Sequence, residues 1–182
     1  QDVFLHDRVT GETTRMSVSS SGQQADSWNG CSSLSGDGRL VAFYSLATNL
    51  ADRDDNGCPD VFVRDRMTAQ TVRVSLASDG TQGSDGSYFP SLSSDGRYVV
   101  FYSSATNLVA GDTNNTHDVF LYDRTTGATV RVSVAADGRQ ALGHSLLAAI
   151  SAQGQYVAFQ SAAPNLVAGD GNGFQDVFVR AR

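Results

Sequence analysis

The segment DVFVRDR at residues 60–66 decides the fold, because it returns at a fixed spacing. The equivalent stretches read DVFLHDR at 2–8, DVFLYDR at 118–124 and DVFVRAR at 176–182. Successive copies begin at residues 2, 60, 118 and 176, which are 58 residues apart each time. A fixed period of this kind is typical of an array of supersecondary units. We therefore expect a single repeat region over 1–182, made of repeats 2–59, 60–117 and 118–175 and the start of a fourth at 176–182.

The composition favours strands over helices. The chain has 182 residues, of which 40% are hydrophobic and 18% are charged, enough for a packed domain. All 13 basic residues are arginine and Glu12 is the only glutamate, so the lysine and glutamate that usually fill exposed helices are missing. Serine, threonine, valine, aspartate and 18 glycines are typical of strands joined by tight turns. The sequence predicts an all-β protein.

Each repeat carries signals for four strands. The DVF segment runs through a short turn into TTRMSV at 13–18, TVRVSL at 71–76 or TVRVSV at 129–134, which is typical of a β-hairpin. If Arg8 lies opposite Thr13, one face of these hairpins is apolar and should be buried; it holds Val3, Leu5, Met16, Val18, Val61, Val63, Val74, Leu76, Val119, Leu121, Val132 and Val134.

The other two strands of each repeat come before the DVF segment. GRLVAFYS at 38–45, GRYVVFYS at 96–103 and GQYVAFQS at 154–161 are apolar on both alternating faces, which indicates central strands. A shorter extended segment precedes each of them at 29–35, 88–93 and 146–151. The unit is therefore a four-stranded antiparallel sheet.

Tandem four-stranded sheets predict the blades of a β-propeller. SGDGRLVAFYS at 35–45 and SSDGRYVVFYS at 93–103 resemble the turn and strand of TolB-type, WD-repeat-like propeller repeats, whereas SAQGQYVAFQ at 151–160 lacks the turn aspartate and arginine. The resemblance covers the whole chain and implies a secreted or periplasmic bacterial protein that makes contacts at the cell envelope. A parallel β-solenoid is the alternative architecture, but its rungs are shorter and do not call for hairpins.

The strand count predicts an incomplete ring. The chain should hold the outer two strands of one blade, two whole blades and three strands of another, about three blades in all. Closed propellers have about four to eight blades. We therefore expect either that the chain is part of a longer protein or that copies self-associate to complete a ring or a head-to-tail array.

A D-x-N-x-x-x-D pattern precedes or overlaps each later DVF segment. Carboxylate and amide oxygens at this spacing could begin a calcium shell, with backbone oxygens and water supplying the remaining ligands. The alternative is that these side chains only bond nearby backbone amides and shape the loop. The candidate calcium ligands are Asp54, Asn56, Asp60, Asp112, Asn114, Asp118, Asp170, Asn172 and Asp176.

The loop before the first strand differs most among the repeats, which read ADSWNGC at 25–31, GSDGSYF at 83–89 and ALGHSLL at 141–147. Residues that the scaffold does not require to be alike are candidates for ligand contact. We therefore select Trp28, Tyr88 and His144 as candidate ligand-binding residues for a glycan or protein partner. Drift in an unconstrained loop is the alternative.

Two further patterns leave alternatives open. Asp7–Arg8, Asp65–Arg66 and Asp123–Arg124, together with Arg15, Arg73 and Arg131, read as cross-strand ion-pair ladders on an outer strand, or less readily as anion-binding clusters. Cys31 and Cys58 lie within one repeat and form either one disulfide or two small buried thiols.

No catalytic motif is evident. The three histidines, His6, His117 and His144, occupy different repeat columns, and neither G-x-S-x-G nor a metal-binding histidine pair at helical spacing is present. The net charge of −6 speaks against nucleic acid as a partner, and no apolar run is long enough to span a bilayer. We expect a non-catalytic binding or scaffolding module, with calcium as the candidate stabilising ion. The alternatives are a substrate-gating propeller of a larger peptidase or glycan-active hydrolase and a structural array in a cell-surface filament.

Overall fold

A computed structural model describes all residues from 1 to 182 and contains only strands as regular structure. Thirteen strands follow one another along the chain: β1 (Phe4–His6), β2 (Thr13–Arg15), β3 (Asn29–Leu34), β4 (Leu40–Ser45), β5 (Asp60–Asp65), β6 (Gln70–Arg73), β7 (Ser87–Leu92), β8 (Tyr98–Ser103), β9 (Asp118–Asp123), β10 (Ala128–Arg131), β11 (Ser145–Ile150), β12 (Tyr156–Ser161) and β13 (Asp176–Ala181). No helix that could cross a membrane is present.

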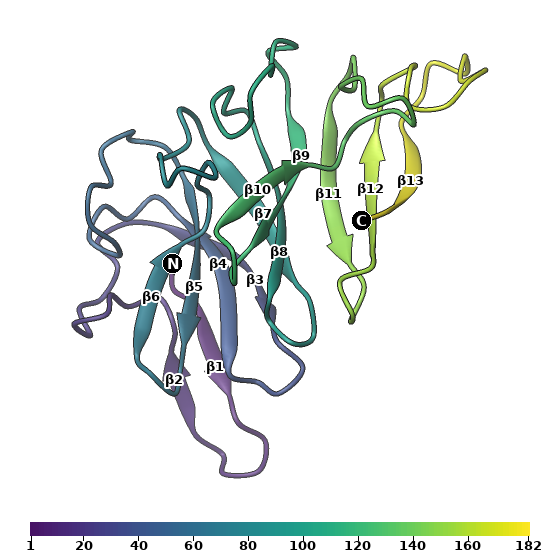
Figure 1. Ribbon diagram of the computed structural model, residues 1–182. Helices are drawn as coiled ribbons and strands as arrows, with labels where there is room; N and C mark the ends of the chain where they lie inside the picture. The colour runs from purple at the N-terminus through teal and green to yellow at the C-terminus, as the bar shows by residue number, and fades with distance from the viewer.

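The strands form four antiparallel sheets, as the sequence predicts. Two sheets are complete four-stranded blades, with strand orders β3-β4-β5-β6 and β7-β8-β9-β10. β1 pairs with β2 as the outer two strands of a preceding blade, and β11-β12-β13 supplies three strands of a following one. Figure 1 shows the sheets fanned out in chain order, from β1 and β2 at the lower left to β11–β13 at the right. The all-β, partial-propeller prediction is confirmed.

The hairpin register differs from the prediction by two residues. His6 rather than Arg8 lies opposite Thr13, and in the next blade Arg64 lies opposite Thr71. The cause is the Asp65 carboxylate, which accepts hydrogen bonds from the backbone amides of Met67 and Thr68 and starts the turn earlier. A shift of two residues leaves each side chain on its predicted face, so Val61, Val63 and Val74 remain buried together.

The hydrophobic core lies between blades rather than inside any one of them. Alternate residues of β4 point in opposite directions: Val41 and Phe43 pack toward β1 and β2, and Ala42 and Tyr44 pack toward the next blade. The innermost strands β3, β7 and β11 contact one another in sequence order. Each central strand is therefore covered on both faces only because a neighbouring blade lies on each side.

The last blade has one uncovered face. Tyr156, Val177 and Val179 are 52, 71 and 69% exposed, whereas their equivalents in the preceding blade, Tyr98, Val119 and Leu121, are buried.

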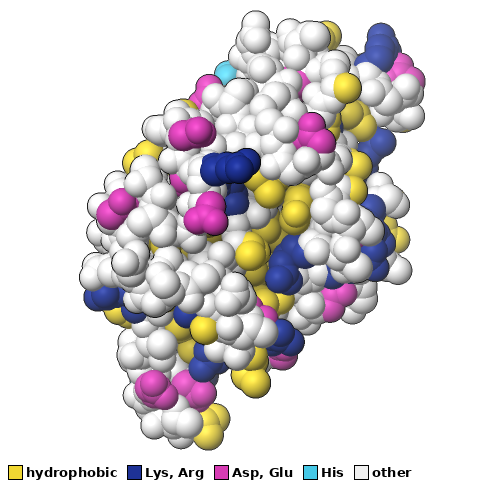
Figure 2. Space-filling model, turned by 60° about the vertical axis from the view of Figure 1, so that its left-hand side comes forward, with side chains coloured by type: hydrophobic (Ala, Val, Ile, Leu, Met, Phe, Trp, Pro, Cys, Tyr) yellow, Lys and Arg dark blue, Asp and Glu magenta, His cyan; other side chains and the backbone are white.

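On the face of the molecule in Figure 2, arginine and aspartate side chains are interspersed, and apolar side chains line a hollow between them. This face carries no continuous surface of one charge.

Candidate functional site

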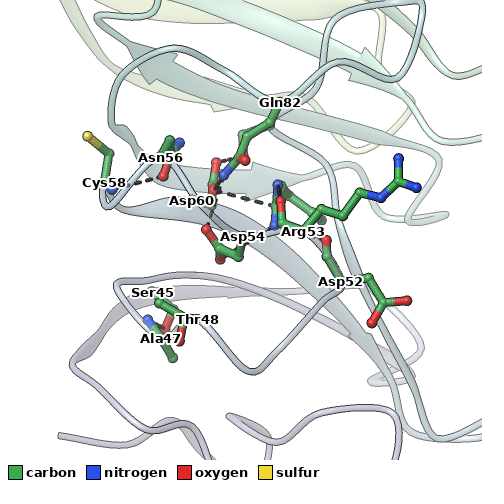
Figure 3. Close-up of polar contacts among 12 residues, drawn as sticks. Ser45, Ala47, Thr48, Asp52, Arg53, Asp54, Asn56, Cys58, Asp60 and Gln82 are labelled. Atoms are coloured by element: carbon green, nitrogen blue, oxygen red, sulfur yellow. Dashed lines mark hydrogen bonds and ion pairs between the residues drawn. The ribbon is translucent and has the colours of Figure 1, made fainter.

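Each of the first two D-x-N-x-x-x-D loops packs around one arginine. Asp54 and Asp60 both lie beside the buried guanidinium of Arg73 from β6, with Arg73 Nη2 3.5 Å from Asp54 Oδ2 and Nε 3.4 Å from Asp60 Oδ2. Gln82 Nε2 donates to Asp54 Oδ1 at 3.1 Å and to Asp60 Oδ2 at 2.7 Å. Figure 3 shows Asp54, Asp60 and Gln82 turned toward one another. A protein cation thus already neutralises part of this acidic loop.

The asparagine of the pattern braces the loop. Asn56 Oδ1 accepts a hydrogen bond from the backbone amide of Cys58 at 2.8 Å, and its Nδ2 donates to the carbonyl of Gly83 at 2.9 Å. The oxygen that a metal ion would need is therefore engaged in shaping the turn. In this loop the residues fit an arginine-centred network better than a calcium shell.

The next repeat builds the same network. Arg131 lies 3.6 Å from Asp112 Oδ2 and 3.8 Å from Asp118 Oδ2, and Asn114 Nδ2 donates to Asp118 Oδ2 at 2.9 Å. The side-chain oxygen of Gln140 accepts a hydrogen bond from Arg131. Gln140 therefore does not bridge the two carboxylates as Gln82 does in the preceding repeat. The arrangement is therefore a recurring structural feature of complete blades.

The third loop, around Asp170, keeps the asparagine contact, since Asn172 Oδ1 accepts a hydrogen bond from the amide of Phe174 at 2.8 Å, but it differs in its ion pairs. Asn172 Nδ2 donates to Asp176 Oδ2 at 3.1 Å, and the loop is exposed. No arginine forms an ion pair with either aspartate. No group of three or more His, Cys, Asp or Glu side chains is arranged to hold a metal ion anywhere in the structure. This loop nevertheless keeps carboxylates that are free of a protein cation.

Burial raises the carboxyl pKa values in the two arginine-centred networks. Desolvation raises the pKa of Asp60 to about 6, although Ser75, Arg73 and Gln82 all favour its charged form. Burial likewise raises the pKa values of Asp54, Asp112 and Asp118. Two buried carboxylates share one guanidinium in each network, so each retains a tendency to hold a proton.

The predicted ion-pair ladders are wrong in their partners. Asp65 pairs with Arg39 through two contacts, Nε to Oδ1 at 2.9 Å and Nη2 to Oδ2 at 2.6 Å. Asp123 pairs with Arg97 in the same way. The cause is the strand pairing: Asp65 lies opposite Leu40, so the arginine just before β4 is its neighbour. Arg73, on the outer strand, points into the buried network instead.

A polar groove opens beside the Arg73 network. Its volume is about 1260 Å³, and it lies between the 48–55 loop, the exposed side of β6 and the turns at 19–23 and 79–82. Its lining is mostly serine, threonine, aspartate, asparagine and glutamine. No sequence pattern predicts this groove, because it forms between loops of neighbouring repeats.

The three candidate ligand-binding residues belong to one row of ring contacts across three blades. Trp28 packs on Tyr44 with ring centroids 5.1 Å apart, and Tyr44 packs on Tyr88 at 5.5 Å. The row continues through Tyr102 and His117 to His144, with each neighbouring pair of centroids 5.3 to 5.4 Å apart. We call this set the aromatic row: Trp28, Tyr44, Tyr88, Phe89, Tyr102, His117 and His144.

Complementary glycines make room for the row. A Cβ atom on Gly30 would lie 2.6 Å from the Trp28 ring, and one on Gly86 would lie 2.3 Å from the Tyr88 hydroxyl. Residues 28 and 86 are equivalent in the repeats, as are 30 and 88, so each of these two blades places one ring and one glycine at these positions. The third repeat has His144 and Leu146 at the same two positions and no glycine.

A bulge in the inner strand aims a further ring into the row. Cys31, Phe89 and Leu147 occupy the same repeat position and all have positive φ, at 20, 50 and 48°. In each blade the register of the inner strand shifts at this point. Phe89 stacks on Tyr44 at 5.6 Å and on Tyr102 at 5.7 Å. Sequence patterns alone do not reveal this residue, because the bulge reverses the expected alternation of faces.

Two histidines meet at the end of the aromatic row. His117 Nδ1 lies 3.2 Å from His144 Nδ1, and Thr116 Oγ1 lies 2.5 Å from the same His144 nitrogen. Burial lowers the pKa of His117, and the imidazole of His144 lowers it further. The third histidine, His6, contacts Thr13 on β2. No histidine is hydrogen-bonded to a serine or a carboxylate.

Both cysteines are free thiols, so the disulfide alternative is wrong. Cys31 is exposed, because the bulge of β3 turns it outward, and this also corrects the alternative of two buried thiols. Cys58 is half-buried, with its sulfur 3.9 Å from Asp85 Oδ1.

The sheets and their loops define a propeller module built from four-stranded blades, and solved structures share this fold. The fold is a TolB-like β-propeller: TolB from Acinetobacter baumannii matches 97% of the chain with a TM-score of 0.53 and 18% identity. A prolyl endopeptidase structure matches 99% with a TM-score of 0.58 and 12% identity, and an oligogalacturonate lyase in complex with manganese matches 98% with a TM-score of 0.52 and 11% identity.

The chain spans 37, 24 and 40% of the lengths of those three structures, in the order given. No protein-family model matches the chain, and no curated protein sequence does either. The shared feature is the blade architecture.

Proposed function

We propose that this chain is a non-catalytic binding module that takes its partner on the aromatic row. One observation carries the proposal: Trp28, Tyr88 and His144, which come from three repeats, join a single row of rings at the loop end of the blades. Trp28 is 39% exposed, and His144 is also exposed. Tyr44 is buried beneath the row, but the other rings are at least partly exposed, and such rings form a surface that binds flat apolar groups.

The charge of the surroundings restricts the partner. Asp85 lies near the row, four arginines of the complete blades (Arg39, Arg73, Arg97 and Arg131) are held in ion pairs elsewhere, and the chain has a net charge of −6. A polyanionic partner is therefore disfavoured. Carbohydrate rings of a neutral glycan, or proline and aromatic side chains of a peptide, fit the row.

The test uses the fluorescence of Trp28, the only tryptophan. Neutral oligosaccharides and proline-rich or aromatic-rich peptides are titrated in separate arms. We expect one of these two ligand classes to quench the Trp28 fluorescence saturably. Tyr88→Ala should weaken the binding about fivefold or more, which corresponds to about 1 kcal/mol.

Two matched controls locate the surface. Phe174→Ala removes an exposed ring outside the row, and Arg53→Ala alters the polar groove. Both should leave the affinity unchanged. Loss of binding with Arg53→Ala but not with Tyr88→Ala would move the site to the groove.

We place the module in a secreted or periplasmic bacterial protein. The Ser-x-Asp-Gly-Arg turns that resemble TolB-type repeats and the fold shared with TolB support this location. Fractionation of a tagged full-length protein tests it, and recovery in the cytoplasm would contradict it.

The substrate-gating propeller of a larger hydrolase is the second candidate. The likeness to a prolyl endopeptidase, of which the matched region is 24%, favours it. A hydrolase domain in the same polypeptide, or loss of hydrolysis on deletion of the blades, would decide for this candidate. The third candidate, a structural array, rests on the regular 58-residue repeat and requires filaments that grow with concentration.

Calcium stabilisation is proposed for the loop of Asp170, Asn172 and Asp176, where no arginine neutralises the carboxylates. A ligand that binds only the folded state raises its melting temperature. We expect millimolar calcium to raise Tm relative to chelator, and Asp170→Asn to abolish the rise. Asp112→Asn serves as the matched variant in an arginine-filled loop. Equal midpoints in calcium and chelator would exclude a calcium site.

A further inference from the structure

The contact between His117 and His144 has the geometry of a metal-ligand pair. The two Nδ1 atoms are 3.2 Å apart and face each other in a direct contact. Two nitrogens bound to one tetrahedral zinc ion at about 2.0–2.1 Å lie about 3.4 Å apart. The observed separation therefore needs little adjustment to accept a metal ion.

Both imidazoles are held in place by the fold. The His117 carbonyl accepts the amide of Ser145 at 2.8 Å, and the His144 carbonyl accepts the amide of Ala162 at 3.0 Å. The His117 ring also packs edge-on against Tyr102, with centroids 5.4 Å apart. A ligand pair whose backbone and one ring are held before binding loses less entropy when the metal arrives.

The identity of the ligands selects the class of metal. Imidazole nitrogen is a ligand for zinc and for other late first-row divalent ions, whereas calcium and magnesium require oxygen. Thr116 Oγ1, which also contacts His144 Nδ1, provides a neighbouring hydroxyl. No third His, Cys, Asp or Glu side chain completes a shell with this pair.

We propose that His117 and His144 form a two-histidine site for a divalent transition-metal ion such as zinc. The site joins the loop before β9 to the loop before β11 and so links the second complete blade to the last one. Two protein ligands leave at least two positions of a tetrahedral ion for water. An oxygen atom of a partner on the aromatic row could take one of them, and that consequence alone rests on the proposed function.

The experiment measures zinc binding by calorimetry, without glycan or peptide. Free thiols also bind zinc, so the parent is compared with a Cys31→Ser, Cys58→Ser background in which all histidine variants are made. We expect one zinc per chain in this background, and His117→Ala and His144→Ala should each weaken binding at least tenfold. His6→Ala is the matched control and should leave the affinity unchanged, because His6 lies on β1 against Thr13.

A second measurement keeps the test independent of folding. Copper bound to the background chain should show nitrogen coupling from two imidazoles in its electron paramagnetic resonance spectrum, reduced to one in either single variant. Melting in chelator shows whether each variant is folded. Zinc affinity that is unchanged by His117→Ala and His144→Ala, or lost with His6→Ala, would overturn the proposal.

The metal site and the proposed binding function can be tested independently. Trp28→Ala and Tyr88→Ala should impair glycan or peptide binding and leave zinc binding intact. A chain that binds zinc through the pair but no oligosaccharide or peptide would support the metal site and contradict the binding function.

Discussion

One buried arginine per complete blade anchors the loop that leads into the DVF strand. Replacing Arg73 with methionine leaves Asp54 and Asp60 buried without a positive partner. Breaking a buried ion pair in this way costs about 3–5 kcal/mol. We expect Arg73→Met to lower the urea midpoint strongly.

Arg97→Met is the comparison for this loss, because the Arg97 side chain is 42% exposed in its pair with Asp123. An exposed pair of this kind contributes about 1 kcal/mol or less. Equal destabilisation by the two variants would contradict the anchoring role of Arg73.

The same networks predict how stability depends on pH. The pKa of Asp60 is raised from 3.8 to about 6 in the folded chain. Between these values the folded state holds a proton that the unfolded state has released, so stability falls as pH rises through this window. Asp54, Asp112 and Asp118 shift in the same direction.

Asp123 has the opposite effect on the pH dependence of stability. Its hydrogen bonds with Arg97 lower its pKa to about 2, so its contribution is present above 3.8 and is lost as pH falls toward 2. We expect urea midpoints to be highest at about pH 4–5. Asp54→Asn should partly flatten the decline toward pH 7, because it removes a carboxyl group with a raised pKa and a negative charge beside Asp60. A midpoint that rises steadily from pH 4 to 7 would refute this account.

Two equivalent turn residues, Ala69 and Gly127, predict stability changes of opposite sign when they are exchanged. Ala69 has a φ of 56°, a left-handed conformation that disfavours alanine, and its repeat equivalent is Gly127 with a φ of 75°. Relief of such strain is worth about 1 kcal/mol. Ala69→Gly should raise the free energy of unfolding by about this amount and Gly127→Ala should lower it, as measured by denaturant titration. Effects of the same sign would show that φ does not govern these turns.

At the scale of elements, the sequence predicts the strands well because their signals are local. The alternation in 38–45 and the recurring DVF segment indicate which strands are central and where each unit repeats. Hairpin register was missed by two residues because it depends on a side chain, Asp65, that caps the turn. Most of the predicted burial survives this error, since a shift of two preserves the faces, but Leu5, Val18, Leu76 and Val134 are only half-buried.

The candidate sites were harder to predict because they depend on contacts between repeats. Variability between repeats predicts Trp28, Tyr88 and His144 as candidates, but their connection through Tyr44, Phe89 and Tyr102 is a product of blade packing. A sequence pattern does indicate the role of Arg73. In each of the three repeats, the outer strand has an arginine two residues before a serine, and the same repeat has the aspartate of its DVF segment. Grouping these columns would have suggested an arginine among the carboxylates.

For the whole molecule, the last blade predicts self-association of this 182-residue chain. Val177 and Val179 are exposed where the equivalent Val119 and Leu121 are buried beneath another blade. Apolar surface of this kind favours association. Sedimentation velocity should show a concentration-dependent shift to larger species, which Val179→Asp reduces.

The control for this association is Val9→Asp, which changes a residue that is 96% exposed on a distant turn. It should leave the sedimentation profile unchanged. A single monomeric species of the parent chain at all concentrations would show that the uncovered face does not drive assembly.

Placing the core between blades has a consequence for how such a protein changes length. Removing a terminal blade uncovers a surface of nearly the same shape and chemistry as the one lost, and adding a blade restores it. Duplication or loss of one whole repeat therefore preserves every remaining interface, whereas an insertion of half a repeat disrupts two of them. The unbroken 58-residue spacing is the record that such a history would leave.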